Sequence, residues 1–419
     1  MNIEMLILAD DFTGALDTGI QFAKSGAATR VITDRDCDFS GIQAQVLVID
    51  TETRHLPPAD AGKVIEEIVC RAAASGVSFF YKKTDSALRG NAGAEMEALM
   101  AASGGRTLHF LPAFPLMNRL VRGGVLYIDS VPVAESVFGK DPFEPVRWSA
   151  VTDILGAQTK LPVHLADEIS EDAEGIIVYN SGSEEELSRL ASRLPLDRRP
   201  LLLAGCAGLA SCLTKVLKFR RTEKEKLPET AEGFLVVSGS VNDVTRRQID
   251  AAKKAGFGYQ NLSVRDKMTD YLWTEEGALK RRELMERIAG SECFVLDTAD
   301  PVCGEKALNW GKSRGMDARQ VGSRIADTLA HLVKELAERE PDRLMLLTGG
   351  DVLFHTMKVL GVKELEPVSE VSPGVILSLY RCGSSFRPVL TKSGGFGKED
   401  LFVQLGEQTQ SARRTEGEV

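Results

Sequence analysis

Short apolar runs that alternate with helix-like segments constrain the fold of this chain more than any other feature. In the first half, the strand-like runs are MLILAD, ATRVITD, VLVID and VSFFYKK, with helical patterns over 15–24 and from residue 59. The runs RTLHFLPAF, EGIIVYN and RPLLLAG continue the series. Apolar runs of this length that alternate with helices are typical of βαβ units with a largely parallel sheet. The first half therefore predicts an α/β domain.

The alternation stops at a charged stretch, FRRTEKEKLPETAEGF, and restarts beyond it. The second series contains FLVVSGS, a helix from residue 242, ECFVLDT, a helix over 320–338, RLMLLTGG, another helix and RPVLTKSGGFG. A chain of 419 residues exceeds what one hydrophobic core usually supports. We therefore expect two α/β domains, each with a largely parallel sheet flanked by helices. The predicted parts are an N-terminal domain at 1–222, a linker at 223–233, a C-terminal domain at 234–405 and a frayed, polar tail at 406–419.

Composition excludes several classes of protein. The net charge of −9 works against a nucleic-acid partner, because binding a phosphate backbone needs a continuous basic face. No apolar segment is long enough to span a bilayer, and the N-terminus lacks the basic region of a signal peptide, which predicts a cytoplasmic protein without a membrane partner. The cysteines show no metal-ligand spacing and are predicted to be reduced packing residues. They are Cys37, Cys70, Cys206, Cys212, Cys293, Cys303 and Cys382.

Two acids follow the first predicted strand directly. In open parallel sheets, ligands bind beyond the carboxyl ends of the strands, so such positions are candidate site residues. Asp10 and Asp11 are suited to hold a hydroxyl group, act as a base or attract a divalent cation through water. The alternative is that one acid only caps the helix that begins near Thr13, but capping does not explain two acids in tandem.

Four cations follow the third and fourth predicted strands: Arg54, Lys82, Lys83 and Arg89. A guanidinium group could grip a carboxylate in bidentate fashion, and an ammonium group adds a point charge, so the cluster predicts an anionic ligand. The alternative is that long basic side chains on loops merely interact with solvent. Lys82 is expected to point away, since adjacent strand residues face opposite sides.

Glycine-rich segments follow three predicted strands of the second half. Glycine lets backbone N–H groups approach phosphate oxygens closely, and a helix N-terminus after each loop would complement negative charge. No segment matches the P-loop or the dinucleotide G-x-G-x-x-G pattern, so the three loops together predict a different kind of nucleotide site. Taken singly, each is a common turn. The segments are Ser238-Gly239-Ser240, Thr348-Gly349-Gly350-Asp351 and Ser393-Gly394-Gly395-Phe396-Gly397.

One segment formally matches the G-x-S-x-G nucleophile elbow of serine hydrolases. It is Gly311-Lys312-Ser313-Arg314-Gly315, but no hydrophobic strand precedes it and both neighbours of the serine are cationic. We therefore do not expect a hydrolase. The five histidines likewise show no metal-ligand spacing.

Taken together, the motifs resemble the four-carbon acid sugar kinase family over nearly the whole chain. The residues that carry the resemblance are Ala9-Asp10-Asp11-Phe12-Thr13-Gly14-Ala15, Thr51-Glu52-Thr53-Arg54, Lys83-Thr84-Asp85-Ser86, Leu88-Arg89-Gly90-Asn91, Ser238-Gly239-Ser240, Thr348-Gly349-Gly350-Asp351 and Lys392-Ser393-Gly394-Gly395-Phe396-Gly397.

The resemblance implies an N-terminal sugar-acid-binding domain, a C-terminal nucleotide-binding domain and an active site in the cleft between them. It also implies an ATP- and Mg²⁺-dependent kinase that phosphorylates the terminal 4-hydroxyl of a tetronate. D-threonate is the preferred candidate, while D-erythronate, L-threonate and 3-oxo-tetronate stay open. A homodimer is compatible with such an enzyme. A non-catalytic sugar-acid sensor is the alternative from another class, and a dehydrogenase ranks last because its glycine fingerprint is missing.

The resemblance also assigns residues. The catalytic base is expected among Asp85, Asp10 and Asp11, with Asp85 favoured, and the metal ligands stay open. Val352 departs from the hydroxyl residue that the family usually has after Thr-Gly-Gly-Asp. Expected sugar-acid contacts are Asp10, Arg54, Lys83, Thr84, Asp85, Ser86 and Arg89. Expected nucleotide contacts are Ser238, Gly239, Ser240, Thr348, Gly349, Gly350, Asp351, Val352, Gly394 and Gly395.

Overall fold

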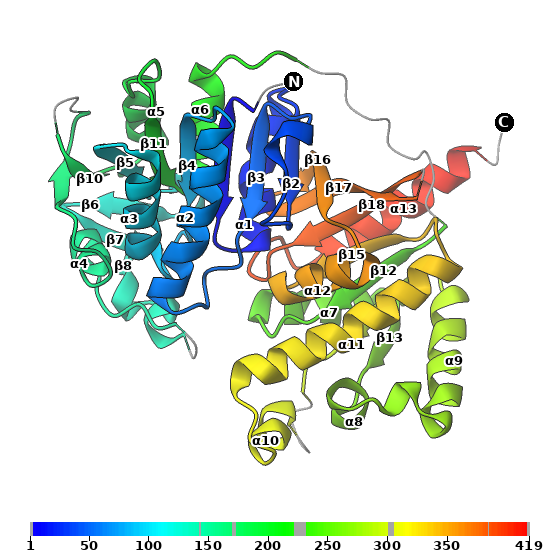
Figure 1. Cartoon of the computed structure of the whole chain (residues 1–419). Helices are drawn as coiled ribbons and strands as arrows, with labels where there is room; N and C mark the ends of the chain where they lie inside the picture. Colours follow the sequence, from blue (N-terminus) through cyan, green and yellow to red (C-terminus); the bar gives the residue numbers. More distant parts are fainter. Residues whose placement is uncertain are drawn as a thin grey trace. The chain divides into compact units, whose positions relative to one another are not determined.

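The chain divides into two compact units, Met1–Lys224 and Glu225–Val419 (Figure 1). The structure, a computed structural model, describes residues 3–141, 144–169, 173–221, 232–300, 306–383 and 385–416, with side chains up to residue 409. The predicted linker at 223–233 lies largely outside the described residues.

The first unit contains a parallel sheet in the order β2-β3-β1-β4-β11-β5-β10-β9. Its strands carry runs of buried apolar residues because helices cover both faces of such a sheet. The bounds are β1 Met5–Ala9, β2 Thr29–Ile32, β3 Val46–Asp50, β4 Phe79–Lys83, β5 Thr107–Leu111, β9 Val163–Ala166, β10 Gly175–Tyr179 and β11 Leu201–Gly205.

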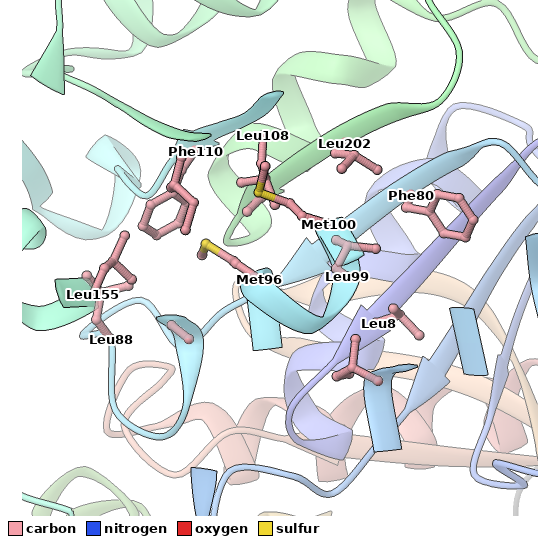
Figure 2. Close-up of a cluster of buried hydrophobic side chains, with 14 of the residues drawn as sticks. Leu8, Phe80, Leu88, Met96, Leu99, Met100, Leu108, Phe110, Leu155 and Leu202 are labelled. Atoms are coloured by element: carbon pink, nitrogen blue, oxygen red, sulfur yellow. The ribbon is translucent and has the colours of Figure 1, made fainter. Parts of the chain in front are cut away.

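Helices α2 and α3 pack together in the first unit, and α1 and α5 each pack against α6. The main core lies between the sheet and α3, where Leu8, Phe80, Leu108 and Phe110 of the strands meet apolar helix residues such as Met96 (Figure 2). The bounds are α1 Phe12–Lys24, α2 Pro58–Ala74, α3 Ala92–Ser103, α4 Val151–Gly156, α5 Glu184–Ser192 and α6 Ala207–Val216.

A small antiparallel sheet follows β5 and was not expected from the sequence. It consists of β6 Arg119–Arg122, β7 Val125–Ile128 and β8 Val131–Pro132. Two 3₁₀ turns, Val133–Glu135 and Val137–Lys140, come after it. The strands are short and mixed in polarity, so their hydrophobic pattern is weak.

The second unit contains a sheet in the order β13-β14-β12-β15-β18-β17-β16. The strands from β13 to β18 in this order are parallel, and the hairpin of β16 and β17 adds antiparallel strands. The expected class, two α/β domains with largely parallel sheets, is therefore confirmed. The bounds are β12 Phe234–Ser238, β13 Gly258–Asn261, β14 Cys293–Asp297, β15 Leu344–Thr348, β16 Glu364–Ser372, β17 Val375–Cys382 and β18 Ser385–Lys392.

Among the helices of the second unit, α7 packs against α13 and α11 against α12. None of the described helices in either unit is long and apolar enough to cross a membrane. The bounds are α7 Asp243–Lys254, α8 Val264–Met268, α9 Glu275–Ala289, α10 Ala307–Lys312, α11 Ala318–Arg339, α12 Gly350–Leu360 and α13 Leu401–Glu416.

The first part of the tail predicted to be frayed at 406–419 is helical, because α13 continues to Glu416, and residues 417–419 lie outside the described residues. Phe402 and Leu405 of this helix join the core formed by β12 and α7. One turn further, Thr409 is also buried, and its hydroxyl donates to the carbonyl of Leu405. The spacing of these residues is that of one helix face, which the polar composition of the tail concealed.

Each sheet has a point at which its strand order reverses. In the first unit the chain leaves β1 toward β2, returns through β3 and then passes to β4 on the other side of β1. In the second unit β12 occupies the equivalent place between β14 and β15. Ligands of open α/β sheets bind outside the carboxyl ends of the strands at such a point. The fold therefore directs attention to the residues that follow β1, β4, β12 and β15.

Candidate active site

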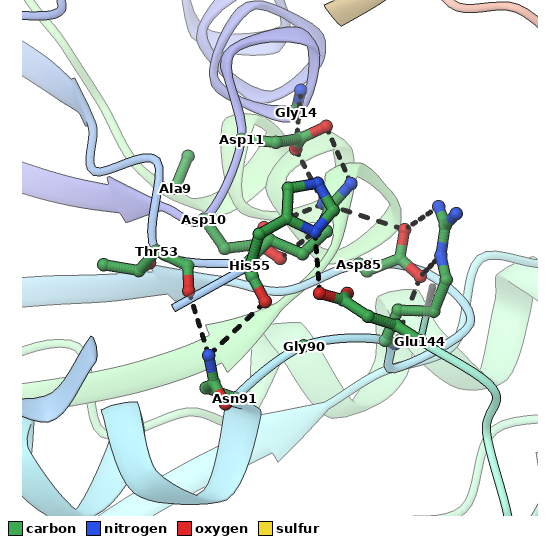
Figure 3. Close-up of polar contacts among 12 residues, drawn as sticks. Ala9, Asp10, Asp11, Gly14, Thr53, His55, Asp85, Gly90, Asn91 and Glu144 are labelled. Atoms are coloured by element: carbon green, nitrogen blue, oxygen red, sulfur yellow. Dashed lines mark hydrogen bonds and ion pairs between the residues drawn. The ribbon is translucent and has the colours of Figure 1, made fainter. Parts of the chain in front are cut away.

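The carboxyl ends of the central strands in the first unit are in register. Ala9 at the end of β1 pairs with Asp50 of β3 and with Lys83 of β4. The segments that follow these strands therefore leave the sheet together. The structure brings three of the predicted acids to this place, as Figure 3 shows: Asp10, Asp11 and Asp85.

Arg54 joins the two acids that follow β1. Its Nε and Nη2 donate to the two carboxylate oxygens of Asp10, at 2.7 and 3.0 Å. Its Nη1 donates to Asp11 Oδ2 at 2.9 Å, and Nη2 lies 2.7 Å from Asp11 Oδ1. The predicted carboxylate grip of Arg54 is thus occupied by carboxylates of the chain itself, which makes the guanidinium group an organiser of the acids.

Asp11 also begins helix α1. Its side chain accepts the N–H of Gly14 at 3.1 Å and the hydroxyl of Thr13 at 2.8 Å, so it caps the helix as well as facing the site. Burial works against the charged form, but Arg54 and then Lys83 outweigh it, and the pKa of Asp11 is lowered. Asp11 therefore caps the helix and also lies in the candidate site, so the two alternatives left by the sequence do not exclude each other.

Asp85 is held mainly by Arg89. Nε and Nη2 of Arg89 donate to its two oxygens, both at 2.9 Å, and the backbone N–H groups of Ala87 and Arg89 donate at 3.2 Å. Arg54 Nη2 lies 3.7 Å away. Burial opposes ionisation, but Arg89 and then Arg54 outweigh it and hold the pKa of Asp85 far below its usual range. Such a carboxylate is a weak base.

The two adjacent lysines of β4 point to opposite sides, as the strand alternation predicts. Lys82 is buried and pairs with Glu95 of α3 at 2.6 Å. Lys83 is buried beside Asp11, yet among the described residues its ammonium group has neither a hydrogen bond nor an ion pair within 4.0 Å. Of the four predicted cations, Lys83 is therefore the one whose charge is open to a ligand.

Gly14 lets Asp11 and Lys83 approach each other. A Cβ atom at this position would lie 2.4 Å from Asp11 Oδ1 and 2.6 Å from Lys83 Nζ. Next to Lys83, the hydroxyl of Thr84 is buried and has no hydrogen-bond partner among the described residues. Ser86 is partly exposed. Asn91 holds the segment that follows β3, donating to the carbonyls of Thr53 at 2.9 Å and Leu56 at 2.8 Å.

The unexpected small sheet adds residues that the sequence did not single out. Arg119 of β6 is within electrostatic reach of Asp85, and its Nε is buried without a hydrogen-bond partner among the described residues. Burial lowers the pKa of Arg119, against the effects of Asp129 and Asp85. Asp141 accepts from Arg89 at 3.2 Å. No local pattern marks Arg119 or Asp141, because only tertiary structure brings them to the strand ends.

Two further acids lie near this place. Glu144 contacts His55 Nδ1 at 2.6 Å, next to Arg54 in the chain (Figure 3). Asp50, the last residue of β3, is buried, and its Oδ2 has no hydrogen-bond partner among the described residues. Burial, followed by the charges of Glu52 and Asp11, raises the pKa of Asp50 well above its usual value.

The strand ends of the second unit form a similar row. Ser238 of β12 pairs with Asp297 of β14 and with Thr348 of β15, which in turn pairs with Lys392 of β18. The three predicted glycine loops follow three of these residues. A Cβ atom on Gly349 would lie 3.9 Å from the nitrogen of Ser240, and one on Gly394 would lie 2.8 Å from Ser240 Oγ. The structure thus brings the three loops together.

Asp297 is the strand-end residue that the sequence missed in this unit. Its two oxygens accept from Arg246 at 2.7 and 2.8 Å, and it also accepts from the hydroxyl of Tyr259 at 3.1 Å. Arg246 in turn donates to Ser238 Oγ at 3.0 Å. Burial opposes ionisation of Asp297, but Arg246 outweighs it and the pKa is lowered. Its place directly after the apolar run CFVL was the signal available in the sequence.

The second glycine loop leads into α12. Gly349 has a φ of 111°, a conformation that favours glycine, and Gly350 is the first helical residue. Asp351 is exposed in the first turn, whereas Val352 is buried against Gly239, where a Cβ atom would lie 2.4 Å from its Cγ2. Val352 therefore acts as a packing residue, which accounts for an apolar side chain at this point.

The serine of the G-x-S-x-G match is not placed as a nucleophile. Ser313 follows the short helix α10 rather than a strand, and its hydroxyl donates to the carbonyl of Trp310. The described cysteines are free thiols, and Cys303 lies outside the described residues.

Two family models match the chain, one in each unit. Residues 5–213 match a model described as a sugar-binding N-terminal domain, and residues 235–402 match a nucleotide-binding C-terminal domain. A solved structure of a protein from Salmonella typhimurium LT2 has the same fold, with a TM-score of 0.75, 21% identity and coverage of 96% of this chain and 98% of that one.

Curated relatives match along nearly the whole length. D-threonate kinase of Salmonella typhimurium is 30% identical over 430 residues, covering 96% of this chain and 97% of that protein. D-threonate kinase of Bordetella bronchiseptica is 31% identical over 424 residues, covering 98% of each. D-erythronate kinase of Heliobacterium modesticaldum is 25% identical over 427 residues, covering 94% of each.

Proposed function

The chain belongs to the four-carbon acid sugar kinase family, and from that premise we propose that it transfers the γ-phosphate of ATP to the 4-hydroxyl of D-threonate. It is an ATP-dependent sugar-acid kinase. D-threonate is preferred because the two relatives with 30% and 31% identity bear that name. D-erythronate, L-threonate and 3-oxo-tetronate are the alternatives, since they differ from it only in stereochemistry or oxidation level.

One observation in the first unit supports the sugar-acid site most directly. Lys83 is a buried cation without an ion-pair partner among the described residues, beside carboxylates that are fixed in place by Arg54. An ammonium group of this kind suits the carboxylate of a sugar acid, and fixed carboxylates suit its hydroxyl groups as hydrogen-bond acceptors. In this proposal Lys83 binds the substrate carboxylate, Arg119 adds charge, and Thr84 and Ser86 contribute hydroxyls.

Arg54 and Arg89 act mainly through the acids that they hold. Arg54 fixes Asp10 and Asp11, and Arg89 fixes Asp85. Fixed acceptors lower the entropy cost of orienting a flexible four-carbon substrate. Their guanidinium groups also lend positive charge to the site, where a substrate carboxylate would otherwise meet three acids.

For the catalytic base, the exposure of the three acids leads us to prefer Asp11 over Asp85, which was favoured from the sequence. The side chains of Asp85 and Asp10 are 10% and 4% exposed, whereas that of Asp11 is 21% exposed, so a substrate hydroxyl would reach Asp11 most readily. We therefore propose Asp11 rather than Asp85 as the group that accepts or orients the hydroxyl proton. Phosphoryl transfer asks for positioning more than for a strong base, so a lowered pKa is tolerable.

The glycine loops of the second unit are proposed to bind ATP through Ser238–Ser240, Thr348–Val352 and Gly394–Gly395. Mg²⁺ usually binds through one or two carboxylates plus the phosphates of the nucleotide, rather than in a cage of protein ligands. The described residues hold no group of three or more His, Cys, Asp or Glu that could bind a metal ion by themselves. Asp351, exposed beside Gly350, would hold the ion, whose charge would neutralise the phosphates.

The test is ADP production from Mg-ATP with a panel of four-carbon sugar acids, each enantiomer and epimer tested separately. Turnover with D-threonate above the other acids supports the proposal, and turnover with another acid reassigns the substrate. Stabilisation by an acid without ADP release would instead favour a sugar-acid sensor. Asp→Asn variants at 10, 11 and 85 then test the base: it should lose kcat with little change in KM, whereas a binding acid should raise KM.

Two further expectations stay predictions. A cytoplasmic location would be tested by fractionation of the native cell. A homodimer would be tested by light scattering, which reports the molar mass in solution.

A further inference from the structure

Lys392, the last residue of β18, is a buried cation for which neither the proposed reaction nor the family models assign a role. The residue is 1% exposed, and no ion pair with a carboxylate is found for it among the described residues. Instead its ammonium group donates to Thr245 Oγ1 at 3.2 Å and to the carbonyls of Ser393 and Gly394 at 3.1 and 3.0 Å. A buried charge without a counter-ion is costly, so its retention calls for an explanation.

Helix α7 holds the same loop from its own side. The hydroxyl of Thr245 donates to the carbonyl of Gly394 at 2.8 Å. One turn later, Gln248 donates to the carbonyls of Phe396 and Lys398 at 3.0 and 2.9 Å. Several carbonyls of one short loop are thus turned toward Lys392 and α7.

The direction of these carbonyls determines where the amide groups point. In a trans peptide the N–H of one residue points opposite to the C=O of the residue before it. The carbonyls of Ser393 and Gly394 face Lys392, so the N–H groups of Gly394 and Gly395 face the other way. Among the described residues neither N–H has an acceptor. Successive free N–H groups of this kind form an anion-binding concavity.

We propose that Lys392 is a positioning residue of the nucleotide site, whose ammonium group turns two carbonyls inward and thereby aims the N–H groups of Gly394 and Gly395 at a phosphate of ATP. This inference rests on the proposed function. A bound phosphate would also supply the counter-ion that Lys392 does not find among the described residues. Ser240 Oγ borders the same place, since a Cβ atom on Gly394 would lie 2.8 Å from it.

Binding of phosphate should then be linked to the proton of Lys392. Burial lowers the pKa of Lys392 to about 7. The groups known to face the ammonium are Thr245 from α7, Phe402 from α13 and the loop carbonyls, none of which carries a charge. A phosphate anion favours the charged form, so nucleotide binding should raise this pKa and take up a proton just above pH 7.

The experiment compares the wild-type enzyme with Lys392→Met and Thr245→Val. For Lys392→Met we expect the Kd of Mg-ATP and the KM for ATP to rise about 10- to 100-fold, as for lost hydrogen bonds to a charged group. The KM of this variant for the sugar acid should change less than about 2-fold. Thr245→Val should also weaken the binding of Mg-ATP without affecting the sugar acid, but by a smaller factor than Lys392→Met. Arg343→Met is the matched control, because Arg343 is also a buried cation but precedes β15 at the opposite end of the sheet.

Proton uptake gives a second readout that a purely structural role would not change. Calorimetry of Mg-ATP binding at pH 8, in buffers of different ionisation enthalpy, should show uptake by the wild type and none by Lys392→Met. At this pH the γ-phosphate is already ionised, since its last pKa is about 6 to 7. If Lys392→Met does not fold, the inference is tested by the ATP affinity of Thr245→Val and by the proton uptake of the wild type. Unchanged ATP affinity together with no proton uptake would then overturn it.

The outcomes separate this inference from the proposed function. Unchanged ATP affinity in folded Lys392→Met, or equal losses of ATP and sugar-acid affinity, would overturn the role of Lys392 while leaving the kinase intact. Failure of the wild type to bind Mg-ATP at all would overturn the proposed function and, with it, this inference.

Discussion

Arg54 and Asp10 form a bidentate ion pair, with Nε and Nη2 of the guanidinium group 2.7 and 3.0 Å from the two carboxylate oxygens. The side chains are 10% and 4% exposed, so solvent screens the pair little. Removing one member leaves the other as a buried charge with fewer partners. The pair is therefore expected to matter for stability as well as for binding.

The first prediction concerns this pair. Arg54→Gln should lower the free energy of unfolding by about 3–5 kcal/mol, because Asp10 and Asp11 lose their main counter-charge. The double variant Asp10→Asn with Arg54→Gln should recover part of that loss, as expected for coupled residues. Urea unfolding of both single variants and the double variant measures the coupling. Strict additivity of the two single changes would show that the pair does not couple.

The second prediction uses the adjacent lysines of β4 as a matched pair. Lys83→Met should raise the KM for the sugar acid about 10- to 100-fold, the value of a lost charged hydrogen bond, with little effect on unfolding. Lys82→Met should instead lower the stability and leave the KM for the sugar acid nearly unchanged. It leaves Glu95 buried without its ion-pair partner and should cost about 3–5 kcal/mol of stability.

Steady-state kinetics and urea unfolding of both variants check the pair. A Lys82 variant with an impaired KM but normal stability would reverse the assignment of the two side chains. Equal kinetic defects in both variants would count against a specific role of Lys83.

The sequence was sufficient to place many of the strand-end residues, although Asp297 was missed. Apolar runs mark where each parallel strand stops, so Asp10, Lys83 and Ser238 could be placed at the carboxyl ends of their strands without coordinates. Register then aligns the strand ends within each unit: in the first, Ala9 pairs with both Asp50 and Lys83, and in the second, Ser238 pairs with both Asp297 and Thr348. The three glycine loops of the second unit lie together for the same reason, because they follow strands whose ends are in register.

The pairing of charges could not be predicted in the same way. Arg54 was expected to grip a ligand, yet its donors are taken by acids more than forty positions earlier in the chain. Arg119 and Asp141 depend on the small sheet of β6 to β8, whose short strands carry little hydrophobic pattern. Glu95 is one of two acids in α3, and only the packing of α3 on β4 shows that it, rather than Glu97, pairs with Lys82.

The third prediction concerns the pH dependence of stability. The folded-state pKa of Asp85 is lowered, so its ionised form contributes stability above the unfolded value near 4, and this contribution is lost as the pH falls. Asp85→Asn lacks this group. The difference in unfolding free energy between wild type and variant should therefore be largest near pH 7 and shrink below pH 4.

Urea unfolding between pH 7 and pH 3 measures that difference. Asp153→Asn provides a control, since Asp153 is an acid in the first turn of α4, away from Arg54 and Arg89 in the chain. A gap that stays constant with pH for Asp85→Asn would mean that its ion pair with Arg89 contributes no pH-dependent stability.

The last prediction tests whether Gly14 is needed for the arrangement of Asp11 and Lys83 in the site. Alanine is favoured over glycine inside a helix by about 1 kcal/mol. If helix propensity alone decided the outcome, Gly14→Ala would therefore stabilise the protein. At position 14, however, the new Cβ atom would lie 2.4 Å from Asp11 Oδ1 and 2.6 Å from Lys83 Nζ. Both groups sit at the ends of side chains and would move aside, leaving the fold intact but the site displaced.

Gly14→Ala should therefore lose activity, with kcat/KM for the sugar acid falling about 10-fold or more, while its unfolding free energy changes by less than about 1 kcal/mol. Gly62→Ala in α2 is the matched control. Its Cβ atom would meet Ala98 at an ordinary 3.7 Å, so it should gain about 0.5–1 kcal/mol and keep full activity. Kinetics and urea unfolding of both variants decide: an active Gly14→Ala enzyme would show that the close approach of Asp11 and Lys83 is not needed for catalysis.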